Sequence, residues 1–378
     1  MKTLWLCILS LFPAVAAALG VHHNLEVKLD PANTFISVTD TIKLKEVSNP
    51  TLTFELHQGL EVTFNGNNIE SMQRIPRSSD VDSVGGHGTA VFHRYVIKLK
   101  DNRKAFQLSY SGSITPTVSV DKDVIETTGV INNDGIFLAR SSRWYPVFSN
   151  SELISFDLTV RLPYGWSSVS QGSGAIASKN VQGVMLSYVW HEDTPQEEMY
   201  LIAAKFKLFS QLNGKVQAQV FLREDDAALA QKYLDATGQY IEMYSRLLGE
   251  YPYSKFAMVE NFWETGYGMP SFTLLGSKVL RFPFILHSSY PHEILHNWWG
   301  NGVYVDYDSG NWAEGLTSYL ADHLLKEQRG IARSHRRGIL QKYRDYVNAG
   351  EDFPLSEFRS RHSARSAAIG YGKTAMLF

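Results

Sequence analysis

The sequence lacks the residues that several common kinds of site require. Its 378 residues include one cysteine, Cys7, which excludes an intramolecular disulfide and any zinc or iron–sulfur site built from several thiolates. Neither sign of charge dominates, because 36 Lys and Arg oppose 38 Asp and Glu for a formal net charge of -2. This balance gives no global attraction to nucleic acid, and the small basic cluster at residues 333–337 is expected to be a solvated helix face.

The remaining composition is that of a folded protein with a large core. Hydrophobic residues make up 44% of the chain and charged residues 20%, which excludes disordered, collagen-like and coiled-coil classes. The length is about two to three times that of a usual domain. We therefore expect two domains.

The first 18 residues form a predicted signal peptide. Lys2 is followed by an apolar run at residues 3–18 that ends in small residues, including Ala14, Ala16 and Ala18. The run is shorter than the roughly 20 apolar residues of a membrane span and contains Pro13. Cleavage would remove Cys7 and would leave a mature chain with no transmembrane anchor, secreted or periplasmic.

Hydrophobic periodicity predicts a β-domain at residues 19–223 and a second domain at residues 224–378. Apolar and polar residues alternate, at least in part, in the segments 25–29, 36–44, 92–99, 106–110, 154–160, 201–208 and 216–222. Residues 77–88, rich in Ser, Asp and Gly, are expected to be a long loop. Helical spacing replaces the alternation at residues 225–249, with Asp225 and Asp226 as an acidic start and Gly249 as a stop.

A possible metal site begins at residues 292–296, which read HEILH. On a helix, His292 and His296 project from one face and can bind one metal, while Glu293 stands close enough to act on a water molecule. Ser288 or Ser289 could cap this helix, Pro291 lies in its first turn, and Gly300 ends it.

Glu314 is the best candidate for a third ligand. A catalytic zinc ion takes three protein ligands and keeps one position open, and helical signals resume at residues 311–320 with Glu314 in the first turn. Asp306 and Asp308 are alternatives, but they fall in the loop between the two helices.

These segments resemble the aminopeptidase N family of zinc metallopeptidases, the gluzincins. The resemblance rests on HEILHNWWGN and NWAEGLTSYL, and it extends to HHNLEVKLDPANTFISVTDTIKL, WYP at residues 144–146, YPY at residues 251–253 and the closing AIGYGKTAMLF. The spacing from His296 to Glu314 is one residue shorter than is usual, which we assign to the loop at residues 306–310.

The resemblance implies an α+β multidomain fold, a function and a cofactor. The fold would be an N-terminal antiparallel β-domain followed by a thermolysin-like, mainly α-helical catalytic domain. The function would be hydrolysis of peptide substrates with one Zn²⁺ per chain, held by His292, His296 and Glu314.

Tyr371 would complete the catalytic set. Tyr371 and Lys373 resemble the family's Tyr-x-Lys-Gly motif, whose tyrosine donates a hydrogen bond to the oxyanion. Residue type alone would favour a core tyrosine at a helix start. In the implied mechanism, Glu293 takes a proton from the attacking water and passes it to the leaving amine.

One family motif is not matched. Family aminopeptidases bind the substrate's α-ammonium with the glutamate of Gly-x-Met-Glu-Asn, and counting from residue 251 places Gly268, Met269 and Pro270 at this motif. Gly268 and Met269 remain predicted substrate-binding residues, but Pro270 takes the glutamate position. Glu264 could fold back toward the amine, whereas Glu260 falls ten residues too early and is expected within a strand.

Three functional hypotheses therefore stay open. The first is an aminopeptidase, and the second is an endopeptidase or an exopeptidase with another terminal anchor, as Pro270 suggests. The third is a non-catalytic peptide-binding protein, against which Glu293 and Tyr371 argue because binding needs neither. Residues 367–378 resemble the start of a helix with no stop signal, where family members continue into a helical domain, so we also expect a C-terminally incomplete chain.

Overall fold

The structure is a computed structural model of the chain. It describes residues 20–378 except 48, 65, 67, 76–91, 101–102, 116–118, 122–123, 127–128, 150–152, 180–184 and 349. The predicted signal peptide with Cys7 and the predicted loop at residues 77–88 lie outside the described residues. Among the helices of the described part, none is long and apolar enough to cross a membrane.

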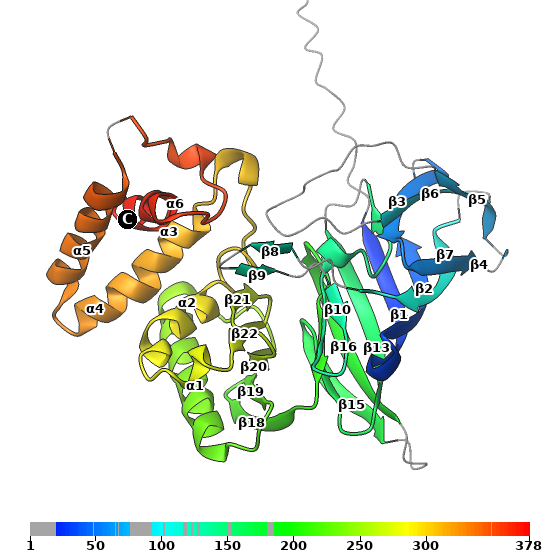
Figure 1. The fold of residues 1–378 in the computed structure, drawn as a ribbon, viewed down its shortest axis with the longest axis horizontal. Coiled ribbons are helices and arrows are strands. Elements are labelled where there is room, and N and C mark those ends of the chain that lie inside the picture. Colours follow the sequence, from blue (N-terminus) through cyan, green and yellow to red (C-terminus); the bar gives the residue numbers. More distant parts are fainter. Residues whose placement is uncertain are drawn as a thin grey trace, which may run out of the picture.

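The N-terminal part is built from β-sheets around one apolar core, as predicted (Figure 1). Its largest sheet has the strand order β15-β16-β13-β1-β2-β7-β4. Neighbouring strands run antiparallel except β1 and β13, which are parallel, so the antiparallel prediction fails for this one pair. The strands are β1 (Val21–Asp30), β2 (Phe35–Leu44), β4 (Leu60–Phe64), β7 (Ala105–Ser113), β13 (Ile154–Pro163), β15 (Ser173–Lys179) and β16 (Met185–Gln196).

Smaller antiparallel sheets complete this part. One has the order β12-β3-β6-β5, a second has the order β10-β11-β17-β14, and β8 pairs with β9. Trp144, from the predicted WYP segment, is fully buried and donates from Nε1 to the Met199 carbonyl oxygen over 3.2 Å. The strands are β3 (Thr51–His57), β5 (Ile69–Ile75), β6 (Phe92–Leu99), β8 (Ser119–Asp121), β9 (Val124–Glu126), β10 (Gly129–Ile131), β11 (Ile136–Leu138), β12 (Val147–Phe148), β14 (Ser167–Val169) and β17 (Leu201–Ala204).

A five-stranded sheet joins the β-rich part to the helices. Its order is β18-β19-β20-β22-β21, formed by β18 (Lys207–Asn213), β19 (Val216–Leu222), β20 (Lys255–Asn261), β21 (Gly266–Met269) and β22 (Phe272–Gly276). Side chains alternate between its faces: Val259 belongs to the core of the β-rich part, whereas Met258 packs with α1 and α2. Strand β19 pairs in parallel with β20. The predicted boundary at residue 223 therefore falls within this sheet. It places β18 and β19 in the β-domain and β20, β21 and β22 in the second domain.

Helix α1 (Ala227–Leu248) packs on β18 and β19 and agrees with the predicted helix at residues 225–249. The Asp226 carboxylate caps it by accepting from the Leu229 N–H, and Gly249 ends it with φ 104°. The prediction of a mainly α-helical second domain is supported only in part. Residues 224–378 also contribute β20, β21 and β22, so this part mixes helix and sheet.

Helices after α2 (Ser289–Leu295) carry two π-helical segments. Residues 313–328 form α3 (Ala313–Thr317), a π segment (Ser318–His323) and α4 (Leu324–Gln328), while α6 (Ala364–Ala367) continues into a second π segment (Ala368–Lys373). Helix α5 (Ala332–Tyr346) lies between them in the chain and presents the basic residues 333–337 on a helix without buried residues. Single turns of 3₁₀-helix occur at Pro31–Asn33, Arg140–Ser142, Val279–Arg281, Ile285–His287, Tyr307–Ser309 and Leu355–Glu357.

Candidate metal centre

Helix α2 (Ser289–Leu295) presents His292 and Glu293 on one face, with His296 directly after its end, because its other face is apolar and packed. Tyr290, Ile294 and Leu295 are fully buried, and the Tyr290 hydroxyl lies 2.5 Å from Thr237 Oγ1 on α1. The predicted serine cap is wrong, since Ser288 Oγ donates to the Phe284 carbonyl oxygen and caps no N–H of α2. Packing against α1 thus fixes the helix in place of a cap.

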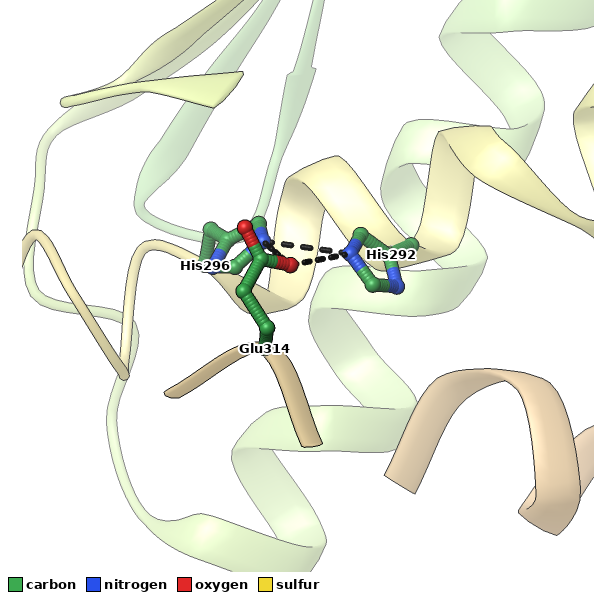
Figure 2. A group of neighbouring side chains, drawn as sticks. All are labelled: His292, His296 and Glu314. Carbon is green, nitrogen blue, oxygen red and sulfur yellow. Dashed lines mark hydrogen bonds and ion pairs between the residues drawn. The ribbon is translucent and has the colours of Figure 1, made fainter. Parts of the chain in front are cut away.

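His292, His296 and Glu314 converge on one point (Figure 2). Nε2 of His292 lies 3.2 Å from Nε2 of His296 and 3.3 Å from Glu314 Oε2, and the third side of this triangle measures 3.4 Å. Zinc bonds of about 2.0–2.2 Å at tetrahedral angles separate ligand atoms by about 3.3–3.6 Å. The three residues therefore fit a tetrahedral zinc ion with one open position.

The alternative third ligands lie elsewhere. Glu314 is in the first turn of α3, as predicted, whereas Asp306 accepts hydrogen bonds from the Asp308 N–H and Ser309 Oγ. Asp308 follows in the same 3₁₀ turn. Neither aspartate belongs to the group of converging ligand atoms.

Both histidines are oriented through their second ring nitrogen. Nδ1 of His292 lies 3.7 Å from Asp322 Oδ2, and Nδ1 of His296 lies 3.2 Å from the Trp299 carbonyl oxygen. Such acceptors hold the proton on Nδ1 and leave Nε2 free for a metal. Asp322 was not predicted, because it reaches His292 from the π segment Ser318–His323.

The charges around the three converging side chains favour a bound cation. Burial disfavours charge on Glu314, but hydrogen bonds and charge from His292 and His296 hold its pKa well below the usual value. Burial likewise opposes protonation of His292, yet Asp322, Glu314 and Glu293 raise its pKa to about 10. The surrounding carboxylates therefore favour a positive charge at this point, which a zinc ion can supply in place of the proton on His292.

Glu293 faces strand β21 across a narrow gap. A Cβ placed on Gly268 would lie 2.4 Å from Glu293 Oε2, so a larger residue here would push the Glu293 carboxylate aside. Burial raises the pKa of Glu293, while His292 and His296 oppose that shift. The predicted base and the predicted substrate-binding strand are thus direct neighbours.

Tyr371 packs against the cluster. Its ring stacks on that of His292 with centroids 6.2 Å apart and an interplanar angle of 17°. Burial, and then the charge of Glu314, raise the pKa of its hydroxyl far above the ordinary value, against the effect of Arg361. The hydroxyl therefore stays protonated and can donate.

The two glutamates considered for the missing amine-binding position, Glu264 and Glu260, have other partners. Pro270 is buried between β21 and β22. The Glu264 carboxylate accepts from the N–H groups of Lys278 and Val279, which excludes the fold-back alternative. Glu260 lies within β20, as predicted, with its carboxylate paired to Arg281 over 2.7 Å.

Comparison with solved structures identifies the fold. No protein-family model and no curated protein sequence matches the chain. Among solved structures, it is similar to an M1 zinc metallopeptidase from Deinococcus radiodurans, with a TM-score of 0.66 and 15% identity over 95% of this chain and 81% of that one. A mutant of that M1 metallopeptidase bound to a Tyr-Ser-Ala substrate gives 0.65 and 15%, with the same coverage. Yeast LTA4 hydrolase gives 0.62 and 15% over 96% of this chain and 58% of that one. The chain has the fold of the M1 zinc metallopeptidases.

Proposed function

We propose that this chain is a zinc-dependent metallopeptidase that hydrolyses peptide bonds. The observation that carries the proposal is the convergence of His292, His296 and Glu314 with the geometry of a tetrahedral zinc site. Zinc bound there would act as a Lewis acid, polarising the scissile carbonyl and lowering the pKa of a water molecule.

Two further residues supply the proton chemistry. Glu293 accepts a proton from the attacking water and delivers it to the leaving amine, a role that its position next to β21 supports. Tyr371 donates its hydroxyl proton as a hydrogen bond to the oxyanion, and its raised pKa keeps that proton in place.

Strand β21 is suited to hold the substrate. It is the last strand of the five-stranded sheet, so one of its edges has no neighbouring strand in the described part of the chain. An extended peptide can pair with such an edge through backbone hydrogen bonds. Gly268 and Met269 would then place the scissile bond beside Glu293.

The test is Glu293→Gln. This variant should bind one zinc ion per chain as the wild type does, because no ligand changes, and should lose about 10²–10⁴-fold in kcat. Glu242→Gln, an exposed change on α1, is the matched control and should leave kcat unaltered. Full activity of the Glu293 variant would refute the proposal.

The ligands named for two similar structures support the aminopeptidase candidate. One similar structure is a D. radiodurans peptidase bound to Tyr-Ser-Ala, and another is a two-domain M1 metallopeptidase bound to L-arginine. Aminopeptidase action is accordingly the first specificity that we propose.

A second candidate is a peptidase that does not require a free α-amino group. Pro270 replaces the amine-binding carboxylate, and Glu260 and Glu264 are engaged elsewhere. Hydrolysis of free-amine and N-acetylated peptides, with and without chelator, separates the candidates. Chelator-sensitive cleavage of free-amine peptides alone indicates an aminopeptidase, cleavage of both indicates the second candidate, and cleavage of neither indicates a peptide-binding protein.

Residues 1–18 support secretion or a periplasmic location. Cell fractionation, with N-terminal sequencing of the mature protein, tests this proposal. A mature chain that retains residues 1–18 in the cytoplasm would contradict it.

A further inference from the structure

A buried lysine lies on the strand next to the candidate site. Lys255, at the start of β20, is 2% exposed. Its Nζ donates to Ser271 Oγ over 2.7 Å and lies 5.3 and 5.6 Å from the ring centroids of Trp190 and Phe272. The amine is thus enclosed by one hydroxyl and two aromatic faces.

This arrangement disfavours a charged amine. Burial lowers the pKa of Lys255 to about 7, and the Glu192 carboxylate on β16 opposes the shift. The other side chains that contact the amine, Trp190, Phe272 and Ser271, carry no charge. A methionine of similar length would avoid the cost of burying an ammonium group, so Lys255 is explained better by function than by stability.

Ser271 connects this lysine to other elements. It is a non-glycine residue with φ 64°, a strained conformation that its neighbours must hold. Its Oγ also accepts from the Gly172 N–H over 3.1 Å, which brings in the β-rich part. Its own N–H donates to Asn297 Oδ1 over 2.6 Å.

Asn297 continues the connection into the metal helix. It is fully buried, directly follows His296, and donates from Nδ2 to the Ile294 carbonyl oxygen over 2.9 Å. Ser271 lies in the turn between β21 and β22. A continuous set of hydrogen bonds therefore runs from Lys255 through this turn to the end of α2.

We propose that Lys255 is a positioning residue for the peptidase reaction: through Ser271 and Asn297 it sets the separation between β21 and α2, and hence the placement of Glu293 against the substrate strand. This inference rests on the function proposed above. Lys255 touches neither the metal ligands nor Glu293, so its effect should appear in kcat and leave zinc binding unchanged.

The first test is Lys255→Met in the full chain. The variant should fold, keep one zinc ion per chain and lose about 10–100-fold in kcat, with KM changed less than threefold, because a displacement of about 1 Å can cost about 100-fold in rate. The ratio of wild-type to variant kcat should be largest below pH 7 and shrink above it, as the lysine loses its charge. Lys215→Met, an exposed lysine paired with Glu250, is the control and should change nothing.

The second test asks whether Lys255 acts through Ser271. In a Ser271→Ala background, Lys255→Met should have little further effect, because the acceptor of its hydrogen bond is gone. Additive losses would overturn the inference. So would a Lys255→Met variant with wild-type kcat and the wild-type pH profile.

A third readout does not depend on hydrolysis. In the zinc-loaded full chain, whose two histidines are held by the metal, the side-chain amide signals of Asn297 in NMR spectra should shift with a midpoint near pH 7, and this shift should vanish in Lys255→Met. Identical titrations in both proteins would overturn the inference. An inactive wild type that shows this difference would refute the proposed function alone.

Discussion

Gly268→Ala offers the sharpest test of the site, because it should displace the Glu293 carboxylate while leaving every metal ligand in place. The added Cβ would lie 2.4 Å from Glu293 Oε2, 3.6 Å from Glu293 Cδ and 3.5 Å from His296 Cδ2. Ordinary contacts begin near 3.4 Å, so the carboxylate must retreat by about 1 Å. The end of a glutamate side chain can do this at low cost to stability.

The expected result is a kinetic defect with intact folding. A general base displaced by about 1 Å should cost about 100-fold in kcat, or about 2.7 kcal/mol of transition-state stabilisation. Zinc content and the midpoint of urea unfolding should match the wild type. The assay is steady-state hydrolysis of a free-amine peptide, with metal analysis of the same samples.

The same strand supplies the control. Gly266 is two residues away on the same face of β21, but the nearest atom to an added Cβ there is Leu275 Cδ2 at 4.0 Å. Gly266→Ala should therefore keep wild-type kcat. Equal activity of the two variants, or loss of zinc from Gly268→Ala, would refute the reasoning.

Three further predictions concern the metal and the surrounding charges. Zinc must displace the proton of His292, whose pKa is about 10, so the apparent affinity for zinc should rise about tenfold per pH unit from pH 6 to 9. Calorimetry in two buffers should detect about one proton released per zinc ion bound. A zinc affinity that does not change with pH would contradict this prediction. Asp322→Ala should weaken zinc binding about 10–100-fold in a chelator competition, because Asp322 orients His292. The exposed change Asp345→Ala is the control and should have no effect. Equal zinc affinities of Asp322→Ala and the wild type would exclude an orienting role for Asp322. Hydrogen bonds to Asp157 and Asp193 raise the pKa of His191, so its contribution to stability is fully present below about pH 6.5 and is lost as pH rises through the raised value. His191→Gln should accordingly lower the urea midpoint at pH 5.5 and leave it unchanged at pH 9, and a larger effect at pH 9 would contradict the sign.

The sequence predicted those parts of the site that depend on local spacing. His292 and His296 are four residues apart on one helix, and Glu314 begins the next, so helical geometry alone brings their side chains to one side of each helix. Tyr371 could be predicted only from the resemblance to the family motif, because a tyrosine alone does not indicate a catalytic role.

Contacts between distant segments could not be predicted in this way. Asp322 meets His292 from within a π segment, and the hydrophobic periodicity of the sequence does not predict that segment. Apolar and polar residues alternate in β18 and β19 as they do in the strands before them, and this alternation does not show which sheet a strand joins. Lys255 begins a strand whose seven residues are all buried, and the sequence does not indicate that the Ser271 hydroxyl accepts a hydrogen bond from it.

The two π segments make this site sensitive to the winding of its helices. Asp322 and Tyr371 each lie within a stretch that holds more residues per turn than the helix around it. Each residue of a regular α-helix turns the chain by about 100°, so the wider π turn changes the direction in which the following side chains point, compared with an α-helix of the same residues. A substitution that returned Ser318–His323 to regular α-helix would therefore turn the orienting carboxylate of Asp322 away from His292 while every functional side chain keeps its chemical identity.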